Sequence, residues 1–255
     1  LYYTIMIRCC IFDLGGTLVD KYSLLPFISL SNSFRKYNIE VPDYVLAKDM
    51  GKKKLDHIQS ICNDSFIKEN YNSINPLDIY KEFNKIQYET MTKHMDIIPE
   101  TKKCIHYLDD KSIRTGITTG FNKEQMDIAV KRLQDNDVVI ENAVSSSCIS
   151  NMSRPYPHMI NKNMEQLRIS HPKHVLKIDD TEVGIQEGIN AGCYTVGVAR
   201  WSINMEVFTY AEKYLLSTSN KDAQGRLEYK LDQSRKKLKD AGADFVIDTL
   251  DELPS

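Results

Sequence analysis

The most constraining feature of this chain is residues 7–17, Ile-Arg-Cys-Cys-Ile-Phe-Asp-Leu-Gly-Gly-Thr. An apolar run that ends in a glycine turn is typical of a buried strand leading into a tight loop. In open α/β sheets, ligands bind outside the carboxyl ends of the strands. We therefore expect Asp13 at such an end, with Gly15 where a second carboxylate two residues on would complete an acid/base pair.

From residue 99 onward, helical periodicity alternates with short apolar runs. A βαβα alternation with continuously apolar strands predicts an α/β fold with a doubly wound parallel sheet. The expected strands after the first are 113–120, 143–146, 174–178, 194–198 and 244–247. The expected helices are 99–110, 122–133, a segment after Ser-Arg-Pro-Tyr-Pro, 185–191 and a largely helical stretch over 204–243.

Residues 22–95 have helical periodicity and little β character, with helices expected over 43–50, 52–62 and 76–94. We expect this block to fold as a helical cap domain, residues 22–96, inserted after the first strand. The Rossmann-like core domain then comprises residues 1–21 and 97–255. A chain of 255 residues is long enough to bury a core in each unit without metals or disulfides.

Composition narrows the class of partner. A formal charge of −2 gives no electrostatic case for binding nucleic acid or a membrane surface, so a small molecule is the expected partner. No apolar run approaches the roughly 20 residues of a membrane span, and the start, LYYTIMIRCCIF, has no basic leader or cleavage site. Six cysteines without a CxxC pair suggest reduced thiols. We expect a cytoplasmic protein.

Four polar clusters lie at the carboxyl ends of expected strands. Because the strands are expected to be parallel, these ends meet at one edge of the sheet. They are Asp13 with the Gly15-Gly16-Thr17 turn, Thr118-Thr119-Gly120, Arg154, and Asp179-Asp180-Thr181. A carboxylate can attack phosphorus, turn N–H groups and hydroxyls can bind its oxygens, and a cation can offset developing charge. Carboxylates can also hold Mg²⁺. Together the clusters favour phosphoryl transfer.

The order of these motifs resembles the haloacid dehalogenase (HAD) superfamily, whose motifs are a nucleophilic Asp, a Ser/Thr, a Lys/Arg and an acidic metal loop. The resemblance implies that Asp13 is the nucleophile and that Mg²⁺ is held by Asp13, the carbonyl of Gly15 and Asp180. It also implies that Arg154 clamps the phosphoryl group. The further substrate-binding residues implied are Gly16, Thr17, Gly51, Thr118, Thr119 and Gly120.

The segment Gly51-Lys-Lys-Lys-Leu-Asp-His57 resembles the G-x-x-K-x-D-H segment of the phosphonatase branch of this superfamily. Residues 118–128, 153–167 and 177–198 resemble further stretches of that branch. The resemblance implies cleavage of the C–P bond of phosphonoacetaldehyde, with Lys54 forming an imine with the aldehyde and His57 moving protons. We expect the pKa of Lys54 to be lowered by burial and by cations such as Lys52, Lys53 or Arg154. The resemblance to this branch also implies a homodimer.

Two other functions stay open at this point. One is a HAD phosphatase acting on a small phosphate monoester; the other is a non-catalytic, HAD-fold binding protein. Four positions depart from the branch. Gly184 stands where the metal loop has a second Asp, and Asp179 stands where it usually has Gly. Ser23 replaces a frequent Cys, and Phe121 lacks the hydroxyl of a frequent Tyr.

Overall fold

The computed structural model describes residues 6–71, 74–149, 153–218 and 220–253. Six parallel strands form one sheet in the order β3-β2-β1-β4-β5-β6. The predicted α/β fold with a doubly wound parallel sheet is confirmed. The strands are β1 Cys9–Phe12, β2 Arg114–Thr119, β3 Asn142–Ser145, β4 Val175–Asp179, β5 Tyr194–Val198 and β6 Phe245–Ile247.

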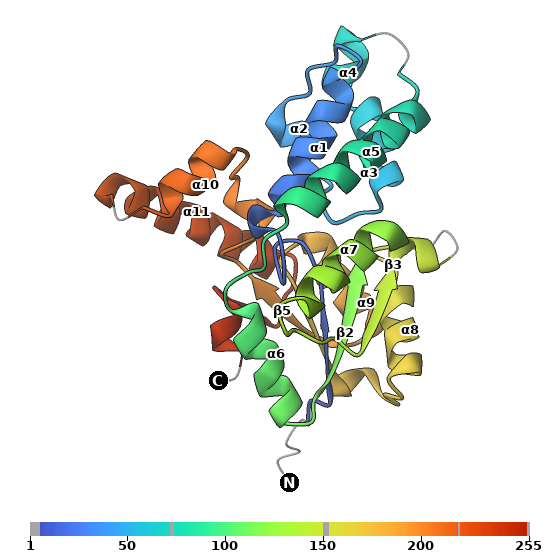
Figure 1. Cartoon of the computed structure of the whole chain (residues 1–255), viewed down its shortest axis with the longest axis vertical. Helices are drawn as coiled ribbons and strands as arrows, with labels where there is room; N and C mark the ends of the chain where they lie inside the picture. Colours follow the sequence, from blue (N-terminus) through green and yellow to red (C-terminus); the bar gives the residue numbers. More distant parts are fainter. Residues whose placement is uncertain (1–5, 72–73, 150–152, 219, 254–255) are drawn as a thin grey trace.

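Helices cover the sheet and extend beyond one of its edges (Figure 1). The first five are α1 Leu24–Arg35, α2 Asp43–Ala47, α3 Lys54–Asn63, α4 Ser65–Asn70 and α5 Pro76–His94. The others are α6 Thr101–Asp110, α7 Lys123–Gln134, α8 His158–Gln166, α9 Glu182–Ala191, α10 Tyr210–Leu216 and α11 Lys221–Asp240.

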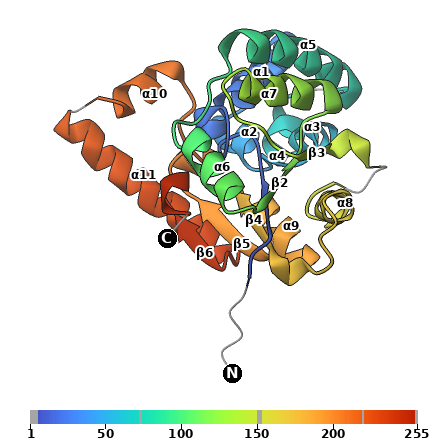
Figure 2. The same ribbon diagram turned by 60° about the horizontal axis from the view of Figure 1, so that its bottom comes forward.

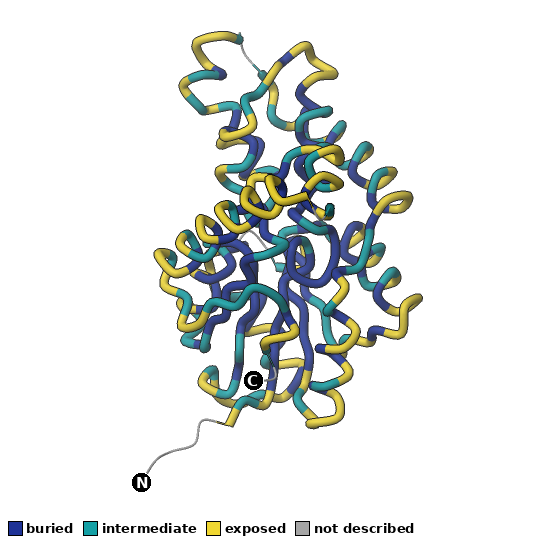
Figure 3. The backbone as a smooth tube through the Cα atoms, turned by 90° about the vertical axis from the view of Figure 1, so that its left-hand side faces the viewer, coloured by how far each residue is buried: buried dark blue, intermediate teal, exposed yellow. Residues whose placement is uncertain are grey.

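The central strand β1 supplies apolar side chains to both faces of the sheet, because successive residues of a strand point to opposite sides. Cys10 and Phe12 pack into a cluster with residues of α6 and α7, whereas Cys9 and Ile11 pack with Ile160 of α8. Figure 2 shows α6 on one side of the sheet and α8 and α9 on the other. The strands are buried along most of their length, while the outer helices alternate between buried and exposed residues (Figure 3).

Helices α1 to α5 pack together beyond the carboxyl ends of the strands (Figure 1). They enclose a hydrophobic cluster that includes Phe34 of α1, Ile58 of α3 and Phe83 of α5. The two chain segments that join this bundle to the sheet lie side by side, since Val19 forms an antiparallel bridge with Ile97. This arrangement has the form expected of an inserted cap, and the boundaries at 21/22 and 96/97 stay predictions.

The stretch 204–243 is largely helical, as predicted, and it divides into two helices: α10 starts at the capping side chain of Thr209, and α11 starts at that of Asn220. Such caps satisfy backbone N–H groups that a helix start leaves free. Helix α4 was not expected; the side chain of Asp64 caps it in the same way. Most other bounds shift by a few residues, as is usual at fraying helix ends.

None of the helices over the described residues combines the length and the apolar character that crossing a membrane requires. The six cysteines, all within the described residues, are unpaired. Four of them, Cys9, Cys10, Cys104 and Cys193, are buried, where burial raises the pKa of each thiol. They act as small apolar side chains of the sheet and its helices.

Candidate active site

The candidate site lies where the order of the strands reverses. β1 pairs with β2 on one side and with β4 on the other, so the loops after β1 and β4 diverge from neighbouring strand ends. Asp13 follows β1, and its N–H donates to the carbonyl of Ile178 in β4 over 2.9 Å. Such a reversal opens a crevice at the carboxyl ends of the strands, which is the usual ligand position in this class of fold.

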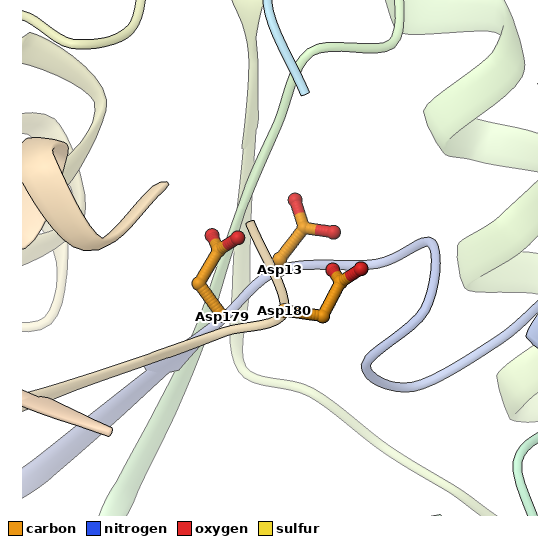
Figure 4. A group of neighbouring side chains, drawn as sticks. All are labelled: Asp13, Asp179 and Asp180. Atoms are coloured by element: carbon orange, nitrogen blue, oxygen red, sulfur yellow. The ribbon is translucent and has the colours of Figure 1, made fainter. Parts of the chain in front are cut away.

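Three carboxylates meet in this crevice (Figure 4). Asp13, Asp179 and Asp180 are buried, and each offers an oxygen within 4.8 Å of the others. The guanidinium of Arg154 lies against them, with Nη1 2.8 Å from Asp13 Oδ1 and Nη2 3.3 Å from Asp179 Oδ2. The structure thus brings together Asp13, Arg154 and Asp180 from three separate motifs, as the sequence predicts.

The crowding of negative charge perturbs these groups. Burial raises the pKa of Asp13 to about 6, with Arg154 opposing the shift and Asp179 adding to it. Burial raises the pKa of Asp180 well above its ordinary value, and the neighbouring charges of Asp13 and Asp179 raise it further. Burial also acts on Asp179, but Arg154 and Lys177 outweigh it and lower the pKa of this carboxyl. The raised pKa values of Asp13 and Asp180 therefore indicate that the pocket disfavours three negative charges at once unless a further cation is bound.

Beneath the carboxylates lies a buried polar network. Arg154 Nε lies 2.8 Å from Glu187 Oε2, and Lys177 Nζ lies 2.8 Å from Asp179 Oδ2. Thr118 accepts hydrogen bonds from Arg154 Nη2 and Lys177 Nζ and donates one to Glu187 Oε2. The hydroxyl of Thr118, predicted to bind substrate, is therefore engaged below the crevice and holds the two cations in place.

The turn after β1 is shaped to approach Asp180. Gly16 has φ of +76°, and a Cβ there would collide with the carboxyl group of Asp180, so only glycine fits. The hydroxyl of Thr17 donates to Asp180 Oδ1 over 3.3 Å. Gly15 lines a small cavity above Asp13, beside Ser23 and Phe121. The residue that would hold a second acid in the motif therefore presents only backbone to this cavity.

The other side of the cavity is formed by the helical bundle. Lys54 is the first residue of α3 and is only 6% exposed. Its Nζ lies 3.7 Å from Met50 Sδ and 5.8 Å from the centre of the Phe83 ring. Burial lowers the pKa of Lys54 to about 8, with the charge of Asp13 opposing the shift. The expected lowering is present, but burial causes it rather than the neighbouring cations.

His57 lies one helical turn beyond Lys54 and is fully buried. Its Nδ1 is 3.5 Å from Lys54 Nζ, a long separation for a hydrogen bond. Burial lowers the pKa of His57 well below its ordinary value, and the charge of Lys54 lowers it further. His57 is therefore a neutral imidazole next to the lysine amine, and not a surface histidine of the bundle.

The loop before α3 packs directly on the sheet's loops. Gly51 has φ of +89°, and a Cβ there would meet Thr181 Oγ1 at 2.8 Å. A Cβ on Gly120 would meet the carbonyl oxygens of Gly51 and Lys52 at 2.8 and 2.9 Å. The cavity between Asp13 and Lys54 is correspondingly small, about 30 Å³, and Thr119 also lines it. The bundle is seen closed over the sheet.

The composition of the pocket suits a divalent cation. Four buried carboxyl groups, those of Asp13, Asp179, Asp180 and Glu187, face two basic side chains, Arg154 and Lys177. The carboxyl groups outnumber the basic side chains by two, which is the charge that one Mg²⁺ carries. Carboxylate and carbonyl oxygens are also the ligands that Mg²⁺ prefers. The residues present therefore fit the predicted magnesium ion.

Two members of the network, Lys177 and Glu187, were missed in the sequence. Lys177 interrupts the apolar run His-Val-Leu-Lys-Ile of β4, and both side chains are fully buried. A charged residue inside a strand that is covered on both faces needs a partner. That single lysine was the available signal. Nothing local in α9 marked Glu187, since its partners come from β2, β4 and the segment before α8.

The family model of the haloacid dehalogenase-like hydrolases matches residues 10–198 of this chain. The chain belongs to this family. The predicted superfamily is thus confirmed, and the protein is a HAD hydrolase. Membership of this hydrolase family implies a small-molecule substrate, as the sequence predicts.

Similar proteins point to one branch of the HAD family. A phosphonoacetaldehyde hydrolase of Bacillus cereus is 30% identical over 257 residues, which are 98% of this chain and 94% of that protein. A bifunctional phosphonoacetaldehyde hydrolase/aminoethylphosphonate transaminase of Clostridioides difficile is 32% identical, but this chain spans only 39% of it. The crystal structure of a phosphonoacetaldehyde hydrolase-like protein from Oleispira antarctica superposes with a TM-score of 0.85 at 25% identity, covering 99% of this chain and 93% of that one. The resemblance to the phosphonatase branch is confirmed.

Proposed function

We propose that this HAD hydrolase cleaves the C–P bond of phosphonoacetaldehyde with Mg²⁺ bound, giving acetaldehyde and phosphate. The observation that supports the proposal most is the buried amine of Lys54, which shares one small cavity with Asp13. A phosphate ester needs no amine for its hydrolysis, whereas an aldehyde can condense with one. The similarity to phosphonoacetaldehyde hydrolases covers 98% of the chain and supports the same substrate.

Lys54 prepares the substrate. Its neutral amine attacks the aldehyde carbon, and protonation of the resulting hydroxyl group, followed by loss of water, gives an iminium ion on the lysine nitrogen. The lowered pKa, about 8, makes the neutral form accessible near physiological pH. His57, itself neutral and 3.5 Å away, takes and returns the protons of this condensation. The apolar flank of Met50 and Phe83 limits solvation of the charged amine.

Asp13 then acts on phosphorus. A carboxylate oxygen of Asp13 attacks, the C–P bond breaks, and its electron pair moves onto carbon and into the iminium group, which becomes a neutral enamine. Protonation of the enamine carbon and hydrolysis of the imine release acetaldehyde and restore Lys54. Water hydrolyses the aspartyl phosphate and restores Asp13. The lysine thus supplies the electron sink without which a carbanion would have to leave.

This scheme accounts for Gly15. In a phosphatase, an acid two residues after the nucleophile protonates the departing alkoxide. Here the leaving carbon receives its electrons into the iminium group, so no alkoxide forms. The backbone of Gly15 beside the cavity leaves room for the substrate between Asp13 and Lys54. The absent acid therefore favours C–P cleavage over ester hydrolysis.

Asp13, the carbonyl of Gly15 and Asp180 would hold Mg²⁺, which would neutralise and orient the phosphoryl oxygens. Arg154 lies 2.8 Å from Asp13 and is placed to clamp the same group. Gly16 and Thr17 shape the turn around Asp180, and Thr119 and Gly120 face the cavity. Thr118 contributes through Arg154 and Lys177, to which it is hydrogen-bonded.

The direct experiment is to incubate the protein with phosphonoacetaldehyde and Mg²⁺ and to measure acetaldehyde and phosphate. Equal amounts of the two products are expected. A panel of small phosphate monoesters tests the phosphatase alternative in parallel. Hydrolysis of a monoester without any acetaldehyde from the phosphonate would overturn the proposal in favour of that alternative, and activity on neither would favour a binding role.

We also propose a cytoplasmic homodimer, on the resemblance to the phosphonatase branch. Sedimentation at micromolar concentration is expected to give twice the 29.4 kDa mass of the chain. A monomer at that concentration would contradict the dimer without touching the chemistry, because the described site residues all belong to one chain.

A further inference from the structure

The helical bundle meets the sheet's own helices where α5 lies beside α7 (Figure 2). Helix α5 helps to form the pocket of Lys54, because the ring of its Phe83 is 5.8 Å from Lys54 Nζ. Helix α7 begins shortly after Gly120, which lines the same small cavity as Lys54 and Asp13. The contact between α5 and α7 therefore joins the two halves of the site close to the cavity.

The start of α7 is closed by two amide side chains. Asn122 Oδ1 accepts a hydrogen bond from the N–H of Gln125 over 2.9 Å, and Gln125 Oε1 accepts one from the N–H of Asn122 over 3.3 Å. This reciprocal pair is a capping box. Because both oxygens face backbone donors, the orientation of each amide is fixed, and each keeps an NH₂ group for a further partner.

Asn84 of α5 accepts from both of these NH₂ groups. Its Oδ1 lies 3.3 Å from Asn122 Nδ2 and 3.2 Å from Gln125 Nε2. Gln125 is only 3% exposed, and a buried donor that loses its partner is destabilising. Asn84, Asn122 and Gln125 form what we call the amide seam. One oxygen from the bundle thus completes the hydrogen bonding of the first turn of α7.

A second contact follows further along the same two helices. Arg132, near the end of α7, donates from Nη2 to the carbonyl oxygen of Thr92 in α5 over 3.1 Å. Between the two polar contacts, Met91 of α5 and Met126 of α7 belong to one hydrophobic cluster. Two separated contacts fix both the position and the rotation of one helix on the other. The contact of Arg132 is exposed to solvent, so the amide seam is the more sheltered of the two.

The proposed chemistry needs this register. Asp13 follows a strand of the sheet, whereas Lys54 begins a helix of the bundle, and a single substrate has to reach both. A misplacement of about 1 Å between reacting groups can lower a rate about 10²-fold. The seam is well placed to prevent it, because α5 carries Phe83 beside the amine and α7 continues from the loop at the cavity.

We propose that Asn84 is a positioning residue, which holds the helical bundle in register over the sheet through Asn122 and Gln125, so that one substrate reaches Asp13 and Lys54 together. This inference rests on the proposed function, which assigns the nucleophile to one half of the site and the amine to the other. Asn84 acts through the two helices and not on the substrate itself.

Two variants of Asn84 separate the accepting oxygen from the volume of the side chain. Asn84→Leu keeps a similar volume but removes the acceptor, and we expect kcat on phosphonoacetaldehyde to fall about 10- to 100-fold with KM within about threefold. Asn84→Asp keeps an accepting oxygen and adds a negative charge at the start of α7, which is favourable there. Its kcat should stay within about threefold of the wild-type value.

Lys85→Leu is the matched control. Lys85 is the next residue of α5, is exposed, and forms no ion pair within the described part of the chain. The same change to leucine should leave kcat and KM as in the wild type. A loss of activity in Asn84→Leu that the control does not share then belongs to the seam and not to an added apolar residue on α5.

Amide hydrogen exchange on the free protein tests the seam without any turnover. Loss of two hydrogen bonds shifts an opening equilibrium about 10- to 100-fold, so exchange over residues 119–125 should quicken by about that factor in Asn84→Leu. Exchange in β1 and β4 should not change, and Asn84→Asp should behave as the wild type. Wild-type kcat in Asn84→Leu, an Asn84→Asp variant as impaired as Asn84→Leu, or equal quickening throughout the chain would overturn the inference. A wild-type protein inactive on the phosphonate would contradict the proposed function, and the exchange over 119–125 would still decide whether Asn84 holds the two helices together.

Discussion

The two halves of the site treat charge in opposite ways. Around Asp13, the sheet's loops place cations beside buried carboxylates, and Arg154 alone contacts three of them. Around Lys54, the helical bundle offers a sulfur, an aromatic ring and a neutral imidazole, with no carboxylate in salt-bridge range among the described residues. The cation beside Asp13 favours its ionised form, which a nucleophile needs. The surroundings of Lys54 favour its neutral amine, which attack on an aldehyde needs.

The largest effect is expected at the nucleophile. Asp13→Asn removes the attacking oxygen's charge and should reduce kcat about 10⁴-fold or more, as removal of covalent nucleophiles does. Steady-state release of phosphate measures it. The exposed Asp110→Asn serves as the control and should keep wild-type activity. Substantial activity in Asp13→Asn would show that the charge-rich half does not supply the nucleophile.

The Lys54→Arg substitution should cause the next largest loss of activity. Arginine keeps a positive charge but has no neutral amine to offer, so kcat on phosphonoacetaldehyde should fall at least about 10³-fold. Lys53→Arg, the adjacent position, is the matched control and should change kcat little. A Lys54→Arg variant that retains activity would remove the imine from the mechanism, even if acetaldehyde is still produced.

The contrast in charge also predicts how substitutions in each half change the stability of the folded protein. Arg154→Met leaves three buried carboxylates without their shared partner and should lower the free energy of unfolding by about 3–5 kcal/mol. Denaturant unfolding measures the change. The exposed Arg226→Met should stay within about 0.5 kcal/mol of wild type. A loss under 1 kcal/mol in Arg154→Met would mean that solvent reaches the network.

The Lys54→Met substitution should raise the free energy of unfolding, whereas Arg154→Met lowers it. The folded pKa of Lys54, about 8, lies below its ordinary value of 10.5, so folding disfavours the charged amine. The penalty is complete below pH 8 and disappears as pH rises towards 10.5. The variant should therefore be more stable by about 1–3 kcal/mol at pH 7, with little gain left near pH 10.5. Unfolding curves at both pH values check it; a less stable variant at pH 7 would mean that Lys54 is paired.

Sequence reasoning succeeded where the information is local. Apolar runs and glycine turns predicted the strands, and strand ends in a parallel sheet must meet, which brought Asp13, Arg154 and Asp180 together. Lys54 and His57 are three residues apart on one helix, so their proximity also follows from local geometry. Motif order supplied the family.

The remainder depends on which way side chains turn after folding. Thr118 and Thr119 are adjacent in β2 and point to opposite sides, one into the cation network and the other towards the cavity. The carboxylate of Asp179 lies where a side chain at position 184 would begin, so its orientation depends on a glycine in the following helix. Neither choice is encoded in spacing alone.

The central claim is that the buried amine of Lys54 forms a covalent bond with the substrate. Reduction with borohydride in the presence of phosphonoacetaldehyde should inactivate the protein and attach a substrate-derived group to the peptide containing Lys54, as read by mass spectrometry. Lys54→Arg should stay unlabelled under the same conditions. A wild-type protein that turns over the phosphonate but shows no adduct at Lys54 would contradict the account.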